Sequence, residues 1–214
     1  MLFIGICGAS GSGKSTLAHA LEERLGSDRC LVLAQDAYYR DHPDLTFEQR
    51  VMLNYDEPDI FDHDLLLEDV QQLLRGGGIT RKAYDYSDHR RADKPDEIIL
   101  PKDILILEGI HTFHDKRLTE LMFLKLYMKV YMKVEPDICL LRRIERDIVE
   151  RGRDIRGIGE QYLNSVKPMF DRYIRNYVSD ADVIVANGGK NARIVDILAG
   201  YVQDELSKGN FTRE

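Results

Sequence analysis

The stretch Gly8-Ala9-Ser10-Gly11-Ser12-Gly13-Lys14-Ser15 has the spacing G-x-x-x-x-G-K-[ST], in which each residue type suits the binding of a polyphosphate. Glycines let backbone N–H groups wrap around phosphate oxygens, and the N-terminus of a following helix adds partial positive charge. We expect the Lys14 ammonium to reach the β- and γ-phosphates and the Ser15 hydroxyl to ligate Mg²⁺. The segment from Gly8 to Thr16 therefore predicts a binding site for a nucleoside triphosphate.

The sequence on both sides of this loop predicts the elements that hold it in place. The apolar run Leu2-Phe3-Ile4-Gly5-Ile6-Cys7 is typical of a buried parallel strand. After the loop, apolar residues recur at helical spacing up to Gly26, a natural helix stop; they are Leu17, Ala18, Leu21 and Leu25. The alternative is an ordinary glycine-rich turn, but strand, glycine loop and helix in this order form the context that the phosphate-binding motif requires.

A second strand is predicted to end at the same phosphates. Four apolar residues, Ile104-Leu105-Ile106-Leu107, lead into Glu108-Gly109, which has the form of a Walker B strand with Glu in place of the commoner Asp. We expect Glu108 to hold Mg²⁺ directly or through water, because Mg²⁺ keeps several waters in proteins. His111 and His114 lie three apart, but without Cys partners or an HExxH frame they do not favour a further metal site.

Asp36 follows the short apolar run 30–34, which predicts another parallel strand. Ligand groups gather at the carboxyl ends of the strands in doubly wound sheets, so Asp36 is expected where a γ-phosphate and its acceptor meet. A carboxylate there can accept the proton of an acceptor hydroxyl during phosphoryl transfer. The alternative is an ordinary loop aspartate or a helix cap.

The segment 36–69 is strongly acidic, with eleven Asp or Glu residues against two arginines. Within it, residues 54–62 have no clean period, which predicts an ordered loop ahead of a helix over 64–74. Because an ionised carboxylate offers only acceptors, Asp56 suits the two hydroxyls of a sugar diol. A solvated acidic surface is the alternative, and it is the favoured interpretation of Asp59 and Asp62.

The segment 80–91 interleaves aromatic side chains with charge and is too polar for a core strand. Tyr84, Tyr86 and His89 would suit a small β-rich flap, about 79–100, that stacks on a base and forms hydrogen bonds with it. A solvated hairpin is the alternative.

The segment 142–156 contains six arginines and no lysine, with four acidic residues between them. Arginine provides the planar, bidentate fork that suits phosphate groups, and Gly152, Gly157 and Gly159 supply hinges. These features predict a helical lid, about 142–160, that closes over the site and excludes water. A solvated helix linked by ion pairs is the alternative.

The remainder of the chain predicts further elements of one α/β domain spanning 1–214. A tandem repeat, Tyr-Met-Lys-Val, predicts a strand within 126–134 with one buried face. Helices are predicted from Pro136, over 160–177 with a break or kink at Pro168, and over 194–206, with a last strand at 183–186. The order Asn187-Gly188-Gly189-Lys190 does not match an Asn-Lys-x-Asp guanine box, which lowers the case for a GTPase.

Composition limits the classes of partner. The net charge of −7 argues against nonspecific binding to nucleic acid or to an anionic membrane. The three cysteines, Cys7, Cys30 and Cys139, predict buried thiols in a reducing compartment rather than disulfides or a metal site. No stretch approaches 18 apolar residues, and a strand starts at Leu2, so we expect a soluble cytoplasmic protein without a signal peptide.

Taken together, these motifs resemble the uridine kinase (uridine–cytidine kinase) family of P-loop kinases, from Leu2 to about Gly189. The matching stretches are the GASGSGKST loop, Gln35-Asp36-x-Tyr38-Tyr39, Asn54-Tyr55-Asp56-x-Pro58, Tyr84-Asp85-Tyr86-x-x-His89-x-Arg91, Glu108-Gly109-Ile110, Arg142-Arg143-x-x-Arg146-Asp147-x-x-x-Arg151-Gly152-Arg153, Gln161-Tyr162 and Val166-Lys167-Pro168-Met169.

The resemblance implies a P-loop NTPase-type parallel sheet flanked by helices, and a kinase acting on a nucleoside 5′-hydroxyl. It implies that Asp36 is the catalytic base and that Asp56 holds the ribose hydroxyls. Tyr84, Tyr86 and His89 match positions beside the pyrimidine, and Gln161 matches a further nucleoside contact. Arginines of the sugar, phosphate and lid regions are matched by Arg143, Arg146, Arg151 and Arg153, and the Mg²⁺ environment by Ser15 and Glu108. Family members are often homotetramers subject to end-product inhibition by pyrimidine triphosphates.

Three departures from the family pattern lie near the expected acceptor pocket. Glu57 stands where His is usual, Lys82 where Pro is usual, and Tyr86 where Phe is usual. The phosphate-binding residues match throughout.

The sequence therefore predicts a pyrimidine nucleoside kinase that transfers the γ-phosphoryl group of Mg·ATP to uridine or cytidine, giving UMP or CMP. In this hypothesis Lys14, Mg²⁺, Arg143 and Arg146 stabilise the transferring group as Asp36 orients the hydroxyl, and Arg151 and Arg153 contact the nucleotide. Two alternatives remain: a P-loop kinase for another small alcohol, such as a phosphorylated pentose, or a nucleotide-binding regulator that has lost catalysis. The acidic segment 36–69 argues against the first, and intact Lys14 and Glu108 against the second.

Overall fold

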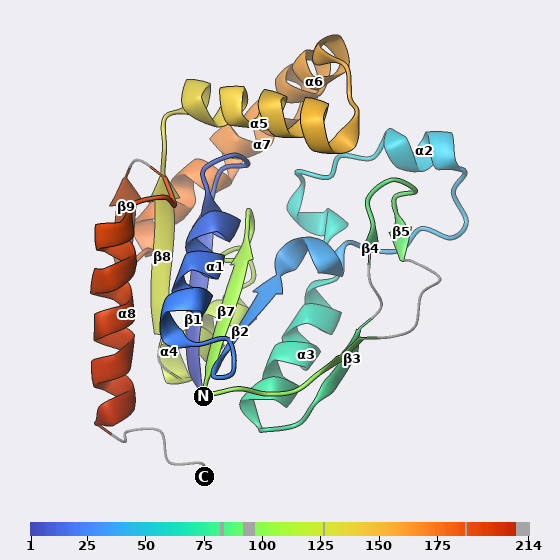
Figure 1. Ribbon diagram of the computed structural model, residues 1–214. Helices are drawn as coiled ribbons and strands as arrows, with labels where there is room; N and C mark the ends of the chain where they lie inside the picture. Colours follow the sequence, from blue (N-terminus) through green and yellow to red (C-terminus); the bar gives the residue numbers. More distant parts are fainter. Residues whose placement is uncertain (82–83, 92–96, 126, 187, 209–214) are drawn as a thin grey trace.

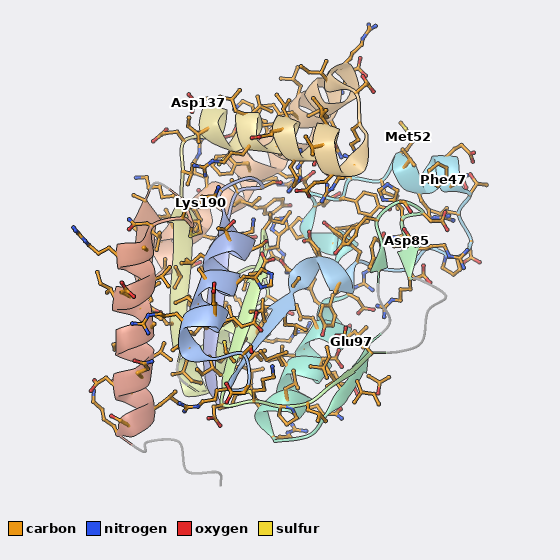
Figure 2. All side chains as sticks on the ribbon, in the orientation of Figure 1. Phe47, Met52, Asp85, Glu97, Asp137 and Lys190 are labelled. Carbon is orange, nitrogen blue, oxygen red and sulfur yellow. The ribbon has the colours of Figure 1, made fainter. Side chains whose placement is uncertain are left out.

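The computed structural model describes residues 1–81, 84–91, 97–125, 127–186 and 188–208. Its centre is a parallel five-stranded sheet with the strand order β2-β7-β1-β8-β9 (Figure 1). The strands of this sheet are β1 (Leu2–Gly8), β2 (Cys30–Ala34), β7 (Ile104–Gly109), β8 (Tyr127–Lys133) and β9 (Val183–Ala186). The predicted class, a parallel sheet flanked by helices, is confirmed.

Helices precede or follow almost every strand. The α-helices are α1 (Lys14–Leu25), α2 (Phe47–Val51), α3 (His63–Leu74), α4 (Lys116–Lys125), α5 (Pro136–Arg151), α6 (Ile155–Gln161), α7 (Lys167–Arg172) and α8 (Ala192–Ser207). Shorter 3₁₀ and π segments are η1 (Gln35–Tyr38), η2 (Pro58–Ile60), η3 (Tyr162–Val166) and η4 (Ile174–Asp180).

Each face of the sheet has its own apolar core. On one face, Ile4 and Ile6 of β1 pack with Leu17 and Leu21 of α1 and with Leu198 of α8. On the other face, strand residues pack with α3 and with η4. Because both faces are covered, the strands consist of nearly continuous apolar residues rather than alternating ones. The expectation that β8 buries one face only is wrong, since Tyr131 is buried against the α3 side while its neighbours Val130 and Met132 are buried against the α1 side.

The register of the sheet brings the functional strand ends together. Ile6 of β1 pairs with Glu108 of β7, and Ala34 of β2 pairs with the same Glu108. The loop after β1, the loop after β7 and η1 therefore leave the sheet at one edge. Figure 1 shows α5 and α6 lying across this edge, with α2 and the β4–β5 ladder to one side of it.

The predicted flap region contains two small antiparallel ladders. β3 (Ile79–Arg81) pairs with β6 (Glu97–Ile99), and β4 (Tyr84–Asp85) pairs with β5 (Arg90–Arg91). Parts of the predicted flap, residues 82–83 and 92–96, lie outside the described residues, as do 126 in the predicted repeat strand and 187 in the predicted turn.

The predicted break near Pro168 takes the form of a π-helical turn. From α6 the chain continues through η3, where Lys167 N–H bonds to the carbonyl of Tyr162, into α7. Pro168 sits in the first turn of α7, where it needs no N–H partner. A π turn absorbs one extra residue and redirects the helix without ending it.

Two other expectations concern the whole chain. All three cysteines are free and buried, as predicted. Among the described residues, no helix is both long enough and apolar enough to cross a membrane.

Candidate active site

The glycine loop lies between β1 and α1 with the geometry that its sequence predicts. Gly13 precedes the first residue of α1 with a left-handed φ of 94°, and a side chain there would also collide with the backbone of Gly189. Gly11 also has a left-handed φ, and it lies against the carbonyl of Cys139 at the start of α5. Glycine at these positions lets the loop fold tightly, with the Ser12 N–H bonded to the Ala9 carbonyl at 3.1 Å, and lets its backbone come close to a ligand.

Lys14, Ser15 and Glu108 meet at the base of this loop. The buried Lys14 ammonium donates to the Ala9 carbonyl at 3.0 Å, so it is folded back over the loop. Ser15 Oγ donates to Glu108 Oε1 at 2.8 Å. Burial raises the pKa of Glu108, whereas the nearby Lys14 lowers it. An oxygen pair beside a lysine is suited to a phosphate-bound cation.

An open cavity of about 820 Å³ lies beside the loop, bounded by η1, the β4–β5 ladder, α5 and α6. Its lining includes eleven residues that the sequence analysis selected: Ser10, Asp36, Asp56, Tyr84, Tyr86, His89, Arg143, Arg146, Arg151, Arg153 and Gln161. The structure thus brings together side chains that lie up to 151 positions apart, from Ser10 to Gln161.

Asp36 and Asp56 face this cavity from different segments. Asp36 is half-buried in η1 directly after β2, and Asp56 is almost fully buried ahead of η2. Burial raises the pKa of Asp56, Arg143 lowers it, and Asp36 raises it again. Arg143 Nη1 lies 4.0 Å from Asp56 Oδ1 and also donates to Ser10 Oγ at 3.0 Å. This one guanidinium therefore links Asp56 to the phosphate loop.

The arginines of α5 and the α5–α6 connection gather around one buried carboxylate, Asp147. Arg146 Nη2 lies 2.7 Å from Asp147 Oδ1 and Arg151 Nη1 3.4 Å from the same atom. Arg143 and Arg153 approach Asp147 Oδ2 at 3.6 and 3.7 Å. Asp147 is fully buried, so it counters one of four positive charges and leaves the cluster strongly cationic. Anionic ligands are expected to bind such a cluster.

Gln161 ties the same arginines together from α6. Its Oε1 accepts hydrogen bonds from Arg143 Nη2 and Arg153 Nη1, both at 2.9 Å. The amide oxygen is thus engaged with protein, which leaves the Nε2 donors of Gln161 to meet an acceptor atom on a ligand.

An aromatic wall forms the opposite side of the cavity. Tyr84 is buried and lies edge-on to Tyr86, with ring centroids 5.4 Å apart. His89 lies against Tyr55 at 4.6 Å with an interplanar angle of 32°. Burial lowers the pKa of His89, and Arg153 and Arg50 lower it further, so the ring is neutral near pH 7 and can both donate and accept.

The ladder that carries His89 is fixed by Arg50 of α2. This buried guanidinium donates to the Asp88 carbonyl at 3.0 Å, to Asp88 Oδ1 at 2.8 Å and to the Leu45 carbonyl at 2.6 Å. His89 itself has a left-handed φ of 52°, which is uncommon for a residue other than glycine. The Arg50–Asp88 pair therefore holds a strained turn in place.

Comparison with known proteins gives a consistent family assignment. The model of the phosphoribulokinase / uridine kinase family matches residues 3–193. This chain belongs to that family. It is 42% identical over 208 residues to the uridine kinase of Geobacillus sp. (strain WCH70), covering 97% of this chain and 96% of that one. It is also 42% identical over 209 residues to the uridine kinase of Leuconostoc citreum (strain KM20), covering 97% of each chain.

The fold of this family member is also found among solved structures. A possible uridine kinase from Bacillus stearothermophilus superposes with a TM-score of 0.55, covering 86% of this chain and 87% of that chain. At 19% identity this likeness supports the fold alone. The predicted resemblance to the uridine kinase family is confirmed by the family match and the two close relatives.

The sequence predicted no role for several residues of the site in this family member. Tyr39, Val51 and Tyr55 line the cavity, and Asp147 and Arg50 hold other lining residues in position. In the sequence Asp147 is one of four acidic residues that balance the arginines of 142–156, and nothing in the pattern distinguishes it as the buried one. The available signal was the spacing of Asp147, which lies one position after Arg146 and four before Arg151.

Proposed function

We propose that this protein is an ATP-dependent pyrimidine nucleoside kinase, which phosphorylates the 5′-hydroxyl of uridine or cytidine to UMP or CMP. The observation that carries the proposal is the single cavity in which two carboxylates, an aromatic wall and an arginine cluster meet beside the phosphate loop. The relatives that cover nearly the whole chain at 42% identity are uridine kinases, which supports the same conclusion.

In the proposed mechanism the two carboxylates have different tasks. Asp36 accepts the proton of the 5′-hydroxyl as that oxygen attacks the γ-phosphorus, and the bond from the γ-phosphorus to the bridging oxygen breaks to release ADP. Asp56 accepts hydrogen bonds from the ribose diol and thereby holds the hydroxyl near Asp36. Tyr84, Tyr86 and His89 hold the base.

The positively charged groups of the site stabilise the transferring group. In this proposal Lys14, Arg143 and Arg146 offset the negative charge that moves between donor and acceptor oxygens. Arg151 and Arg153 lie near the α5–α6 turn at Gly152, whose φ of 62° is left-handed, and we propose that this part, 142–160, closes over the nucleotide. The flap at about 79–100 and this lid are proposed as parts of one domain spanning 1–214.

The donor set beside the loop fits Mg²⁺. Ser15 Oγ and Glu108 provide hard oxygen ligands, and burial of Glu108 favours a nearby positive charge that would lower its raised pKa. No group of three or more His, Cys, Asp or Glu side chains suited to a metal ion is found in the described ranges, which is compatible with an ion held largely by phosphate oxygens and water. Mg²⁺ bound there supplies neutralisation of the phosphate charge.

The wider biological assignments follow from the proposed activity and the family resemblance. We propose a role in pyrimidine salvage in the cytoplasm, with a small-molecule nucleoside as partner and with neither nucleic acid nor a membrane. A homo-oligomer, and a tetramer in particular, is proposed on the resemblance alone.

The proposal is tested by phosphate transfer from Mg·ATP to uridine, cytidine, adenosine, guanosine, ribulose 5-phosphate and pantothenate. We expect turnover on uridine or cytidine with a 5′-monophosphate product. Turnover on ribulose 5-phosphate or pantothenate alone would retain the phosphate loop but contradict the nucleoside pocket. Absence of turnover on the whole panel, with ATP still bound, would favour a regulator without catalysis.

A further inference from the structure

His111 is a buried side chain that the proposed mechanism does not use, yet it contacts the segments of both carboxylates. It follows Ile110 in the loop after β7, and only 1% of its surface is exposed. Its backbone N–H donates to Gln35 Oε1 at 2.9 Å, and Gln35 precedes Asp36 in η1. Its ring Nε2 lies 2.8 Å from the carbonyl oxygen of Asp56. His111 therefore contacts both the residue that precedes Asp36 and the backbone of Asp56.

The hydrogen bonds of His111 assign its tautomer. A carbonyl oxygen can only accept, so His111 Nε2 carries the hydrogen that points at Asp56. The ring is neutral, because burial lowers the pKa of His111 to about 3. His111 Nδ1 is therefore an acceptor, and the Tyr177 hydroxyl, 3.0 Å away, donates to it.

The network of hydrogen bonds continues from Tyr177 to His114. The Tyr177 hydroxyl has a single hydrogen, which is directed at His111, so it accepts from His114 Nδ1 at 3.0 Å. Tyr177 comes from η4, on the far side of this loop, and is itself buried. The result is a directed chain of hydrogen bonds, from His114 through Tyr177 and His111 to the backbone of Asp56.

The backbone of Asp56 is held from both sides. Its N–H bonds to Asn54 Oδ1 at 3.1 Å, and its carbonyl accepts from His111. With both peptide groups bonded, the backbone that carries the Asp56 carboxylate at the cavity wall is held in place before a ligand arrives. Gln35 also packs closely on the loop that carries His111, because a Cβ on Gly109 would overlap the Gln35 side chain.

We propose that His111 is a positioning residue for the acceptor: through its Nε2–H bond to the Asp56 carbonyl and its backbone bond to Gln35, it sets Asp56 relative to Asp36. The inference rests on the proposed function, because it concerns the carboxylate that would hold the ribose. Beyond that function, His111 would connect the loop after β7 to η1 and to the loop that carries Asp56.

A pair of substitutions separates this role from simple packing. The amide nitrogen of Gln can take the place of an imidazole Nε2, whereas that of Asn is too short and corresponds to Nδ1. We expect His111→Asn to raise the KM for uridine about tenfold, the size expected for a lost buried hydrogen bond, while the KM for ATP changes less than about twofold. His111→Gln should stay within about threefold of the wild-type KM for uridine, because the donor to Asp56 is kept. His19→Gln, at an exposed histidine of α1 that lines no part of the cavity, serves as the control with unchanged kinetics.

Other patterns of kinetic results would overturn the proposal. Equal KM values for uridine in a folded His111→Asn variant and the wild type would do so, as would equal rises in the KM values for uridine and ATP. Failure of His111→Gln to restore binding would show that the Nε2 bond is not the cause. If His111→Asn does not fold, Tyr177→Phe gives the same test, with an expected rise of about threefold in the KM for uridine alone because it removes the donor to His111 Nδ1; an unchanged KM for uridine there would also overturn the proposal.

A second measurement keeps this inference separate from the proposed function. In ¹⁵N-labelled wild-type protein, NMR of the imidazole nitrogens, assigned through the loss of signals in His111→Gln, reads the tautomer without any substrate. A neutral ring protonated at Nε2 supports the bond to Asp56. A ring protonated at Nδ1 overturns it, even if the enzyme phosphorylates uridine. Absence of nucleoside phosphorylation with the Nε2 tautomer present would contradict the proposed function and leave the bond in place.

Discussion

The phosphate end and the acceptor end of the cavity are built in different ways. At the phosphate end, one continuous stretch from Gly8 to Thr16 provides a backbone cradle, and Glu108 arrives from the adjacent strand. At the acceptor end, side chains come from η1, the loop before η2, the β4–β5 ladder, α5 and α6. The first end depends on local backbone conformation, whereas the second depends on contacts between distant segments.

From this difference we expect the acceptor end to determine which substrate is bound. A loop that binds through its own amides tolerates change around it, because its geometry is set by a few glycines and a helix N-terminus. The acceptor side is held by buried polar links such as Arg50 with Asp88 and His111 with Asp56. Changes to these links are therefore expected to alter acceptor binding and to leave donor binding nearly unchanged.

The largest expected effect lies at the phosphate end. Lys14→Met keeps the length of the side chain but removes the ammonium that lies over the loop. We expect kcat to fall by about a thousandfold, in the range found when a charge that stabilises transferring phosphate is removed. The KM for uridine should change by less than about threefold, since Lys14 does not line the acceptor wall. Steady-state kinetics with both substrates varied will measure this, and a comparable loss of uridine binding would break the comparison.

A smaller, oppositely distributed effect is expected for Arg50→Met. The substitution removes two hydrogen bonds to Asp88, which precedes His89 in the turn, and one to the Leu45 carbonyl. We expect the KM for uridine to rise about tenfold and kcat and the KM for ATP to change much less. Arg40→Met, which removes an exposed arginine of the same acidic segment, is the matched control. Unchanged uridine kinetics in a folded Arg50→Met protein would remove this residue from acceptor positioning.

The smallest effect concerns stability at the junction of the two ends. Burial acts to raise the pKa of Asp147, but Arg146, Arg143 and Arg151 outweigh it and hold the pKa below the usual value of 3.8. A lowered folded-state pKa means that the stabilisation is present above the unfolded pKa and is lost as pH falls through the folded one. We expect Asp147→Asn to lower the free energy of unfolding by about 2 kcal/mol at pH 7 and by less at pH 3, which lies below the unfolded pKa. Urea unfolding of both proteins at the two pH values will test this, and a difference that is equal at both would contradict it.

The sequence was sufficient to predict those parts of the fold and the site that depend on a local pattern of residues. The fold class, the strands of the central sheet and most of the long helices follow from apolar runs and helical spacing. The structure differs at element ends, at the π turn before Pro168 and in the burial of Tyr131, and it adds the helices α2 and α4, which the sequence did not predict. The predicted side chains of the acceptor pocket lie around one cavity, although their roles stay predictions.

The sequence could not show the contacts that hold those side chains. Arg50 and Asp88 are 38 positions apart, and His111 and Asp56 are 55 apart, so no spacing rule joins them. For His111 the sequence indicated only that it and His114 do not favour a further metal site, and only packing shows its bond to Asp56. In the sequence Asp147 is only one of four acidic residues between the arginines of the predicted lid, whereas burial makes it the centre of the arginine cluster.

The most direct test of the central claim is the steady-state turnover of Asp36→Asn with uridine and Mg·ATP. The substitution keeps the shape of the side chain and removes its ability to accept the proton. With Asp36 as the base, we expect kcat to fall by about a thousandfold and the affinity for ATP, measured by titration calorimetry, to stay unchanged. Near-normal turnover would contradict Asp36 as the base and, with it, the assignment of the two carboxylates.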